Sequence, residues 1–277
     1  MKTSSISLVT ALRVVAVTVL LVITLFPLYW IISTAFKPNE EVLAYPPKWI
    51  PSSLSFSNFS FLLDPDGQRF MLNSAIVTFG STVLSLLLGT PAAYALSRHK
   101  FPYNAGKFVG LWVLITRFMP PFVFIIPMFL MFRSVGMLDT PLAVLLVYAG
   151  GNLPLVIWVM TPAVAQIPGE INEAAMVDGA GTFRTFISIV LPLLRPAIAT
   201  AGSLAAIFAW NEFFFALILT QDQARTMPVF IATFISDRGL DWGAIAASSF
   251  VLAFPIVVLA LLFQKQFIAG LTRGAIK

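Results

Sequence analysis

The stretch EAAMVDGAGTFRTFISIVLP, from Glu173 to Pro192, is a moderately polar segment between two very apolar halves of the chain. Just upstream, Pro168 suits a first helical position, while Glu170 and Glu173 place negative charge at the positive end of a helix dipole. Gly179 is a natural left-handed stop for that helix. The stretch therefore predicts a short helix that ends in a glycine turn.

After the turn, the same stretch predicts a second short helix, with Thr182 as its cap and Pro192 at its end. Its apolar residues recur at the i, i+3, i+4, i+7, i+8 spacing of one helical face; they are Phe183, Phe186, Ile187, Val190 and Leu191. One helix is thus apolar enough to lie against a hydrophobic body, while the other presents carboxylates and small residues to water. The pair predicts a docking element.

The composition of the chain is that of an integral membrane protein. Apolar residues make up 58% and charged residues 10% of the sequence, and the mean hydropathy is +0.91, which lies outside the usage of soluble domains. Cysteine is absent, so disulfides and thiolate metal sites are excluded. The net charge of +5 comes from basic residues scattered at loop ends, a pattern typical of topology signals and not of nucleic-acid binding. We expect one all-α transmembrane domain over residues 1–277, surrounded by membrane lipid.

Six runs are long enough to cross a hydrocarbon core, which takes about 20 helical residues. They cover residues 13–36, 71–96, 108–132, 141–165, 197–220 and 244–264. An even number of spans puts both termini on one side. The termini and the loops 97–107 and 166–196 hold ten Lys and Arg when Arg13 at the start of the first span is counted, against six in the opposite loops, so the positive-inside rule places them in the cytoplasm. The loop 37–70 is then periplasmic.

Several prolines lie within these spans, and kinked helices usually pack against protein or line a cavity. This pattern favours a transporter or channel.

Two charged residues also lie deep inside spans, Arg117 in ITRFMPP and Glu212 in AWNEFFFAL. Each costs about 2.5–3.5 kcal/mol on insertion scales, so neither is expected to face lipid. Either the two pair with each other, as in a simple packing contact, or both line a translocation path together with Trp210 and Asn211.

Seven positions of the opening stretch form the pattern EAA-x3-G-x9-I-x-LP with every spacing intact. This pattern resembles the EAA motif of the membrane subunits of bacterial binding-protein-dependent ABC importers. The segments KPNEEVLAYPPKWIP, TRFMPP, WNEFFFALILT and QKQFIAGLTRGAIK are similar to those of the maltose-type carbohydrate permeases, so the resemblance covers essentially the whole chain. It implies the type I importer permease fold with six transmembrane helices, a place in the bacterial inner membrane, and the import of a sugar.

The resemblance also implies a division of labour among subunits. It implies a heterodimer with a second permease, two copies of a cytoplasmic ATPase, and a periplasmic or lipid-anchored solute-binding protein. In agreement, the chain has no G-x-x-x-x-G-K-[ST] phosphate loop and no aspartate cluster for Mg²⁺. We therefore expect no catalytic residue, no metal site and no cofactor in this chain, with ATP and Mg²⁺ bound by the partner ATPase.

In the family, the helix that carries the motif docks in a cleft of the ATPase. The resemblance implies that role here for Glu170, Glu173, Ala174, Ala175, Asp178 and Gly179. The family's C-terminal tail can enter the seam between the two ATPase subunits, and the positions of this chain that match its pattern are Gly270, Leu271, Thr272, Gly274 and Lys277.

Other classes of protein are less consistent with the sequence. The EAA motif is shared across substrate classes, so an importer permease for another solute, such as an amino acid or glycerol phosphate, stays open. A secondary transporter would show inverted repeats and more intramembrane acids than Glu212. A membrane enzyme would need convergent catalytic groups, yet the single histidine, His99, lies in a basic loop.

Overall fold

The computed structural model describes residues 8–99, 101–236 and 239–273. Its internal contacts divide the chain into two compact units. Unit 1 comprises residues up to 68 together with 231–254, and unit 2 comprises residues 69–230 and those from 255 onward. Three helices contribute to both units, namely α3 (Pro65–Arg98), α12 (Met227–Ala232) and α13 (Trp242–Arg273). The expectation of a single domain stays a prediction.

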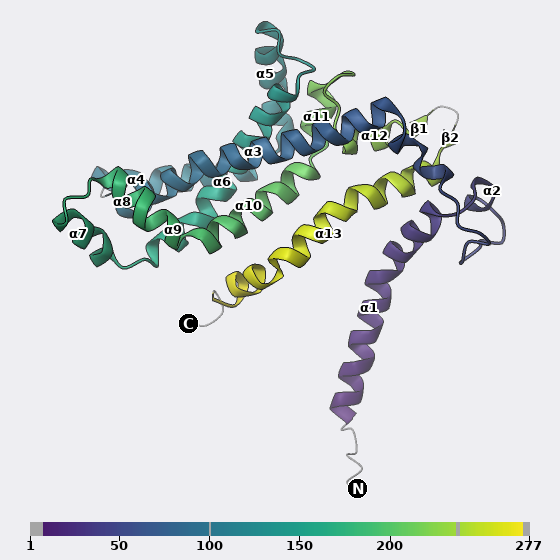
Figure 1. Ribbon diagram of the computed structural model, residues 1–277, viewed down its shortest axis with the longest axis horizontal. Coiled ribbons are helices and arrows are strands. Elements are labelled where there is room, and N and C mark those ends of the chain that lie inside the picture. The colour runs from purple at the N-terminus through teal and green to yellow at the C-terminus, as the bar shows by residue number, and fades with distance from the viewer. Residues whose placement is uncertain (1–7, 100, 237–238, 274–277) are drawn as a thin grey trace. The chain divides into compact units, whose positions relative to one another are not determined.

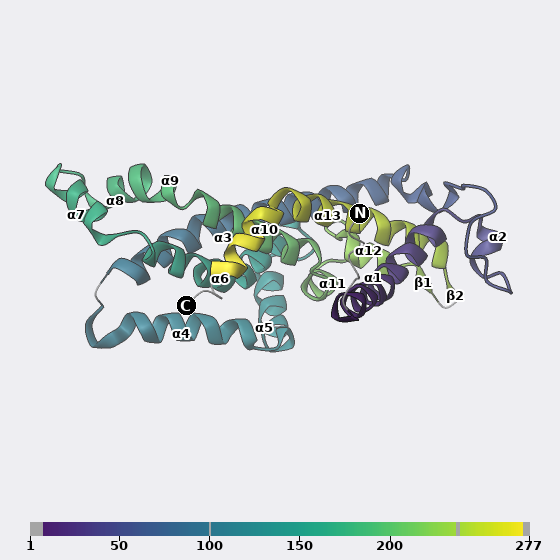
Figure 2. The same cartoon turned by 90° about the horizontal axis from the view of Figure 1, so that it is seen from below.

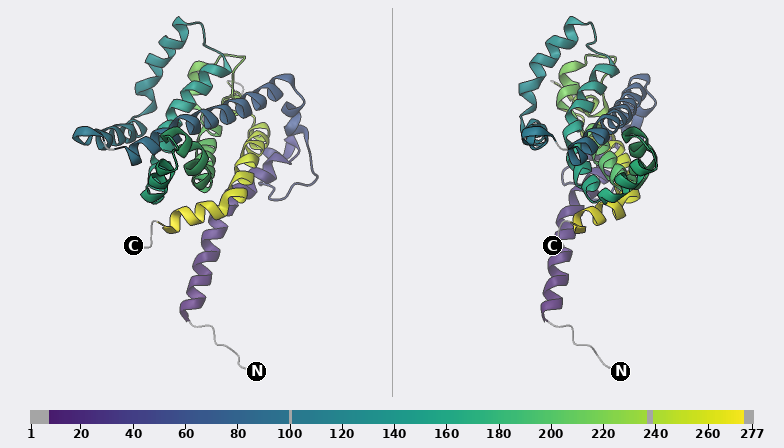
Figure 3. Two further views of the ribbon diagram at one scale, coloured as in Figure 1. Left: turned by 60° about the vertical axis from the view of Figure 1, so that its left-hand side comes forward. Right: turned by 90° about the vertical axis from the view of Figure 1, so that its left-hand side faces the viewer.

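Unit 1 begins with the long apolar helix α1 (Leu8–Ala35) (Figure 3). Residues 9–35 of this helix form a candidate span, and no residue in its 18-residue apolar window is buried. The connection that follows holds α2 (Asn39–Val42) and the 3₁₀ helix η1 (Ser57–Leu62). A two-residue antiparallel pair, β1 (Ile235–Ser236) with β2 (Gly239–Leu240), precedes α13. Aromatic rings join these parts, because Phe36 at the end of α1 packs on Phe59 and Phe250 with ring centres 5.0 and 5.7 Å away.

Unit 2 is built on three helices that run side by side, α3, α6 (Pro141–Ala165) and α10 (Arg195–Trp210) (Figures 1 and 2). Polar side chains on buried faces bond to carbonyls of the neighbouring helix. Ser85 of α3 donates to the carbonyl of Ala149 at 3.0 Å, and Asn152 of α6 donates to that of Ala205 at 3.0 Å. Satisfied contacts of this kind let polar groups lie in an apolar core.

The remaining helical elements of unit 2 flank this core. They are η2 (Pro102–Asn104), α4 (Ala105–Phe118), α5 (Pro121–Ser134), α7 (Gly169–Val177), α8 (Thr182–Thr185), the π-helical turn η3 (Phe186–Val190), α9 (Leu191–Leu193) and α11 (Phe214–Leu219).

The predicted spans match four continuous helices, α1, α3, α6 and α13. Two bent pairs are also long and apolar enough, α4 with α5 at 92° (Figure 2) and the segment 182–193 with α10 at 77°, so the described part of the chain offers up to six spans. The bounds of α6 agree with the predicted span 141–165. The all-α class is confirmed.

Two predicted spans are not continuous helices. The third, 108–132, breaks between α4 and α5, where Pro120 is extended and Pro121 begins α5. Successive prolines lack the amide hydrogens that a continuous helix needs. The fifth, 197–220, breaks at residues 211–213 between α10 and α11. Both breaks fall at the segments that carry the intramembrane charges.

Candidate functional site

Helix α7 has the predicted stop. Gly179 has φ +79°, its N–H donates to the carbonyl of Met176 at 3.0 Å, and the N–H of Ala180 donates to that of Ala175 at 2.9 Å. These two bonds form a Schellman motif, which satisfies carbonyls at a helix end. Pro168 lies one position earlier than predicted, as the N-cap residue.

Most of the predicted docking residues on α7 face outward. Glu170, Glu173, Ala174, Asp178 and Gly179 are exposed, whereas Ala175 is buried. Ala175 therefore packs within the chain and offers little surface to a partner in this structure. The roles of all these residues stay predictions.

Sequence reasoning missed the exposed apolar side chains of α7 and α8. Val177 is 87% exposed, Phe183 is 79% exposed, and Met176 is also exposed. On α7 the available signal was Met176 and Val177, apolar residues in a helix predicted to face water. They follow Glu173 by three and four residues, so this face of α7 mixes a carboxylate with apolar side chains, as surfaces that a protein partner covers do.

Hydrogen bonds link α7 and the residues just before it to α3. Arg98, at the end of α3, donates to the carbonyl of Ile167, which lies between α6 and α7, and to that of Val164 in α6 at 3.0 Å. Asn172 of α7 donates to the Tyr94 hydroxyl of α3 at 3.3 Å. Helix α7 is therefore joined to α3 by a hydrogen bond and to α6 by the short connection of residues 166–168.

The second helix of the loop differs from its prediction. Gly181, not Thr182, is the N-cap residue, and the helix continues through Pro192 to Leu193 before it bends at Leu194. A proline lacks only its own N–H, and the wider turn of η3 directly before Pro192 accommodates this loss.

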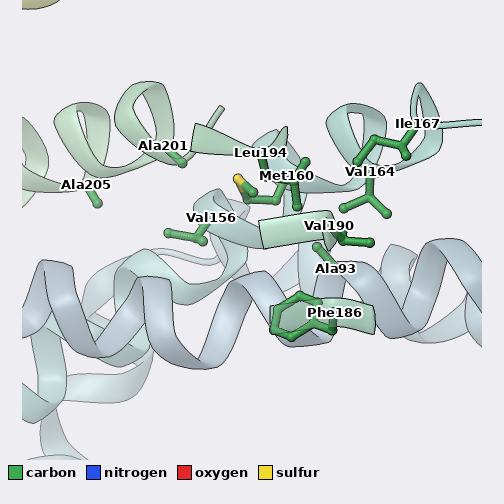
Figure 4. Packing of buried hydrophobic residues seen from close by; sticks show 10 residues of the cluster. All are labelled: Ala93, Val156, Met160, Val164, Ile167, Phe186, Val190, Leu194, Ala201 and Ala205. Carbon is green, nitrogen blue, oxygen red and sulfur yellow. The ribbon is translucent and has the colours of Figure 1, made fainter. Parts of the chain in front are cut away.

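The predicted apolar face of this helix is only partly buried. Phe186 and Val190 pack in a core with residues of α3, α6 and α10 (Figure 4). Tyr94 stacks on Phe186 with ring centres 5.0 Å apart. Phe183, which precedes the π-helical turn, and Ile187 within it are exposed instead.

Arg117 lies in the last turn of α4, directly before the 92° break. Its guanidinium donates to the carbonyl of Gly151 at 3.4 Å and lies 4.6 Å from the ring centre of Phe208. The side chain is nevertheless exposed. Added Cβ atoms on Gly150 and Gly151 would meet nothing within 4 Å, so open space adjoins this part of α6.

Glu212 lies in the break between α10 and α11. Its carboxylate accepts the N–H groups of Phe215 at 3.0 Å and Ala216 at 3.3 Å, and its carbonyl accepts the Tyr148 hydroxyl at 3.0 Å. Glu212 thus caps the start of α11. Within the described residues, Glu212 and Arg117 form no ion pair, so the pairing hypothesis is wrong for this structure.

The other predicted path residues adjoin the same break. Trp210 is the last residue of α10 and is partly buried, and Asn211 is exposed and donates to the carbonyl of Ile207 at 2.8 Å. In the predicted tail, the backbone of Gly270, Leu271 and Thr272 belongs to α13, while Gly274 and Lys277 lie outside the described residues.

Residues 85–271 match the family described as the binding-protein-dependent transport system inner membrane component. The chain belongs to this family. It is 37% identical over 259 residues to the trehalose transport system permease protein SugB of Mycobacterium tuberculosis, with 91% of this chain and 92% of the relative covered. It is 34% identical over 270 residues to the trehalose/maltose transport system permease protein MalG of Thermococcus litoralis, with 96% of each covered.

A solved structure has the same fold. It is a bacterial ABC transporter involved in the import of the acidic polysaccharide alginate, with a TM-score of 0.80 at 22% identity, covering 96% of this chain and 98% of that chain. The predicted resemblance to sugar importer permeases and the predicted fold are thus confirmed. The chain is a multi-pass membrane component of a transport system.

Proposed function

We propose that this chain is the permease subunit of an ATP-driven importer that moves a carbohydrate delivered by a solute-binding protein. The observation that carries the proposal is α7, a helix with a capped C-terminal end and an exposed face, bonded to α3 through Tyr94 and, at Ile167 just before α7, through Arg98. A helix placed in this way transmits movement from a partner to the spans. The names of the curated relatives, trehalose and trehalose/maltose permeases, support a sugar as the substrate.

The partners follow from the same proposal. A second permease subunit completes a heterodimer, two copies of a cytoplasmic ATPase bind ATP and Mg²⁺, and a periplasmic or lipid-anchored protein presents the sugar. The ATPase docks on α7 through Glu170, Glu173, Ala174, Asp178 and Gly179, with Ala175 beneath them. The tail from Gly270 to Lys277 contacts the ATPase as well.

The proposed orientation places both termini and α7 in the cytoplasm. The excess of Lys and Arg in the loops on that side supports it. A reporter that is active only in the cytoplasm is expected to work when fused after Arg98 and to fail when fused within residues 40–65. Activity in the reverse pattern would show the opposite orientation.

The proposed translocation path passes the two helix breaks. An exposed arginine inside a candidate span needs a polar surrounding, and the open surface at Gly150 and Gly151 beside Arg117 provides room for a solute. Trp210 and Asn211 border the other break, where Glu212 caps α11. In this arrangement Arg117 contacts the solute, and Glu212 holds the shape of the break.

One transport assay tests both the function and the path. In vesicles with the assembled importer and its binding protein, uptake is expected for a mono- or disaccharide and not for an amino acid. Arg117→Met should reduce this uptake about tenfold, the equivalent of losing one charged hydrogen bond of about 1.5 kcal/mol. Arg133→Met, in the last turn of α5, is the control and should retain uptake. Transport of an amino acid alone would overturn the sugar assignment.

A further inference from the structure

Helix α1 is longer than a membrane core. Its 28 residues extend about 42 Å at 1.5 Å per residue, against a hydrocarbon thickness of about 30 Å. If Arg13 lies at one boundary, a span of about 20 residues reaches the other boundary near Ser33. Ser33 and Thr34 are buried beneath the connection that follows, whereas the helix before them is exposed. With Arg13 at one boundary, the final turns of α1 cross the bilayer interface.

The connection after α1 folds back along these final turns. The ring of Trp49 lies 5.7 Å from that of Trp30 and 5.9 Å from that of Phe26. The carbonyl of Trp49 accepts hydrogen bonds from the Tyr29 hydroxyl at 2.6 Å and the Ser33 hydroxyl at 3.0 Å. Phe26 is nine residues before the end of α1, or about 13 Å along its axis. Trp49 thus lies beside the span and not beyond its end.

An internal salt bridge pairs Lys48, the charged residue within 45–50, with Glu41. Lys48 donates to the carboxylate of Glu41 at 2.6 Å, and the backbone N–H of Ser52 donates to the same group at 3.1 Å. These donors lower the pKa of Glu41 to about 2, so the pair stays ionic at neutral pH. The outward surface of the fold-back is apolar instead, with Trp49 60% and Ile50 75% exposed.

We propose that residues 45–50 form a lipid-facing anchor in the headgroup–acyl boundary at the C-terminal end of α1, held at that depth by Tyr29 and Ser33. Tryptophan prefers this boundary, where its ring is in apolar surroundings and its N–H is near water. A soluble protein would have to approach the loop from beyond the end of α1. The depth of Trp49 along the span favours lipid as the occupant of this surface.

The absence of cysteine from the sequence makes single labels simple to introduce. Ile50→Cys, labelled with a polarity-sensitive fluorophore, is studied in the full chain assembled in phosphatidylcholine vesicles that carry a spin label near the headgroup. We expect emission shifted to the blue and loss of fluorescence in the spin-labelled lipid, with no soluble protein added.

Leu63→Cys is the matched control. Leu63 is 83% exposed in the same unit, and it follows η1, where Asn58 donates to the carbonyls of Ala35 and Lys37 at 3.1 and 2.9 Å, beyond the span. Its label should emit as in water and be quenched by aqueous iodide. If the label at position 50 behaves in the same way, or becomes shielded only when the binding protein is added, lipid anchoring is wrong.

A second variant tests what holds the segment. Tyr29→Phe combined with Ser33→Ala removes both donors to the Trp49 carbonyl. The label at position 50 should then lose part of its lipid quenching and gain quenching by iodide. Unchanged lipid quenching would overturn the role assigned to these two hydroxyls.

Discussion

Replacement of Gly179 by valine is expected to abolish uptake while the permease still inserts in the membrane. A left-handed backbone costs a residue other than glycine about 1–2 kcal/mol, and Gly179 has φ +79°. A Cβ at this position meets no atom of the chain within 4 Å, so the added bulk projects toward the proposed ATPase. The measurement is the amount of ATPase that co-purifies with the permease, together with ATP hydrolysis stimulated by the binding protein.

Gly136→Val separates this loss of docking from general backbone strain. Gly136 has φ +68°, it also has no neighbour within 4 Å, and it closes α5 with the same pattern of bonds as Gly179. Its N–H donates to the carbonyl of Arg133, and that of Met137 donates to Phe132. The strain should be similar, but the ATPase should be retained. If both variants lose the ATPase equally, the coupling role of α7 is wrong.

Features that depend on neighbouring residues were predictable from the sequence. The end of α7 at Gly179 follows from one residue without a Cβ, and the span 141–165 follows from a continuous apolar run that α6 reproduces. The spacing of the EAA motif indicated the family from the sequence, because the motif lies entirely within twenty residues. Local signals such as these do not depend on how the rest of the chain packs.

Features that depend on packing were not predictable. In the second loop helix, Phe186 is buried against Tyr94 of α3 while Phe183 is exposed, although both fit one α-helical face. The spans of Arg117 and Glu212 looked continuous, because hydropathy averages over the short breaks that lie next to them. The partner of Glu212 is the backbone of α11, and a charge pattern cannot show it.

A long-range contact of this kind leads to the second large expected effect. Asp139, in the turn between α5 and α6, accepts the backbone N–H groups of four successive residues 82 to 85 positions later, at 2.9–3.2 Å. They belong to Gln221, Asp222, Gln223 and Ala224. The same loop bonds to α3, where Asn73 donates to the carbonyl of Gln223 at 2.8 Å. Asp139 thus joins the α5–α6 turn to a loop that α3 also holds.

Asp139→Asn should lower the unfolding temperature of the purified permease by about 6 °C. Asparagine tolerates the left-handed conformation of this position, φ 57°, so the change removes the charge and leaves the backbone in place. Hydrogen bonds to a charged group contribute about 1.5–3 kcal/mol each, and the exposure of three of the four amides reduces the total to about 2 kcal/mol. For a chain of this size, 1 kcal/mol corresponds to about 2–4 °C.

The dependence of this effect on pH separates the charge from the shape of the side chain. Burial alone would raise the pKa of Asp139, but the four N–H donors outweigh it and lower the pKa below 3.8. A carboxylate with a lowered pKa contributes stability that is present above its ordinary pKa and is lost as the pH falls below it. The unfolding temperatures of wild type and Asp139→Asn should therefore converge below about pH 3.8.

Asp222→Asn is the control, since this exposed carboxylate lies 3.6 Å from Arg69 and such pairs contribute less than about 1 kcal/mol. Equal unfolding temperatures of Asp139→Asn and wild type at neutral pH would show that the four amide bonds do not hold this loop. So would a difference in unfolding temperature that stays the same in acid.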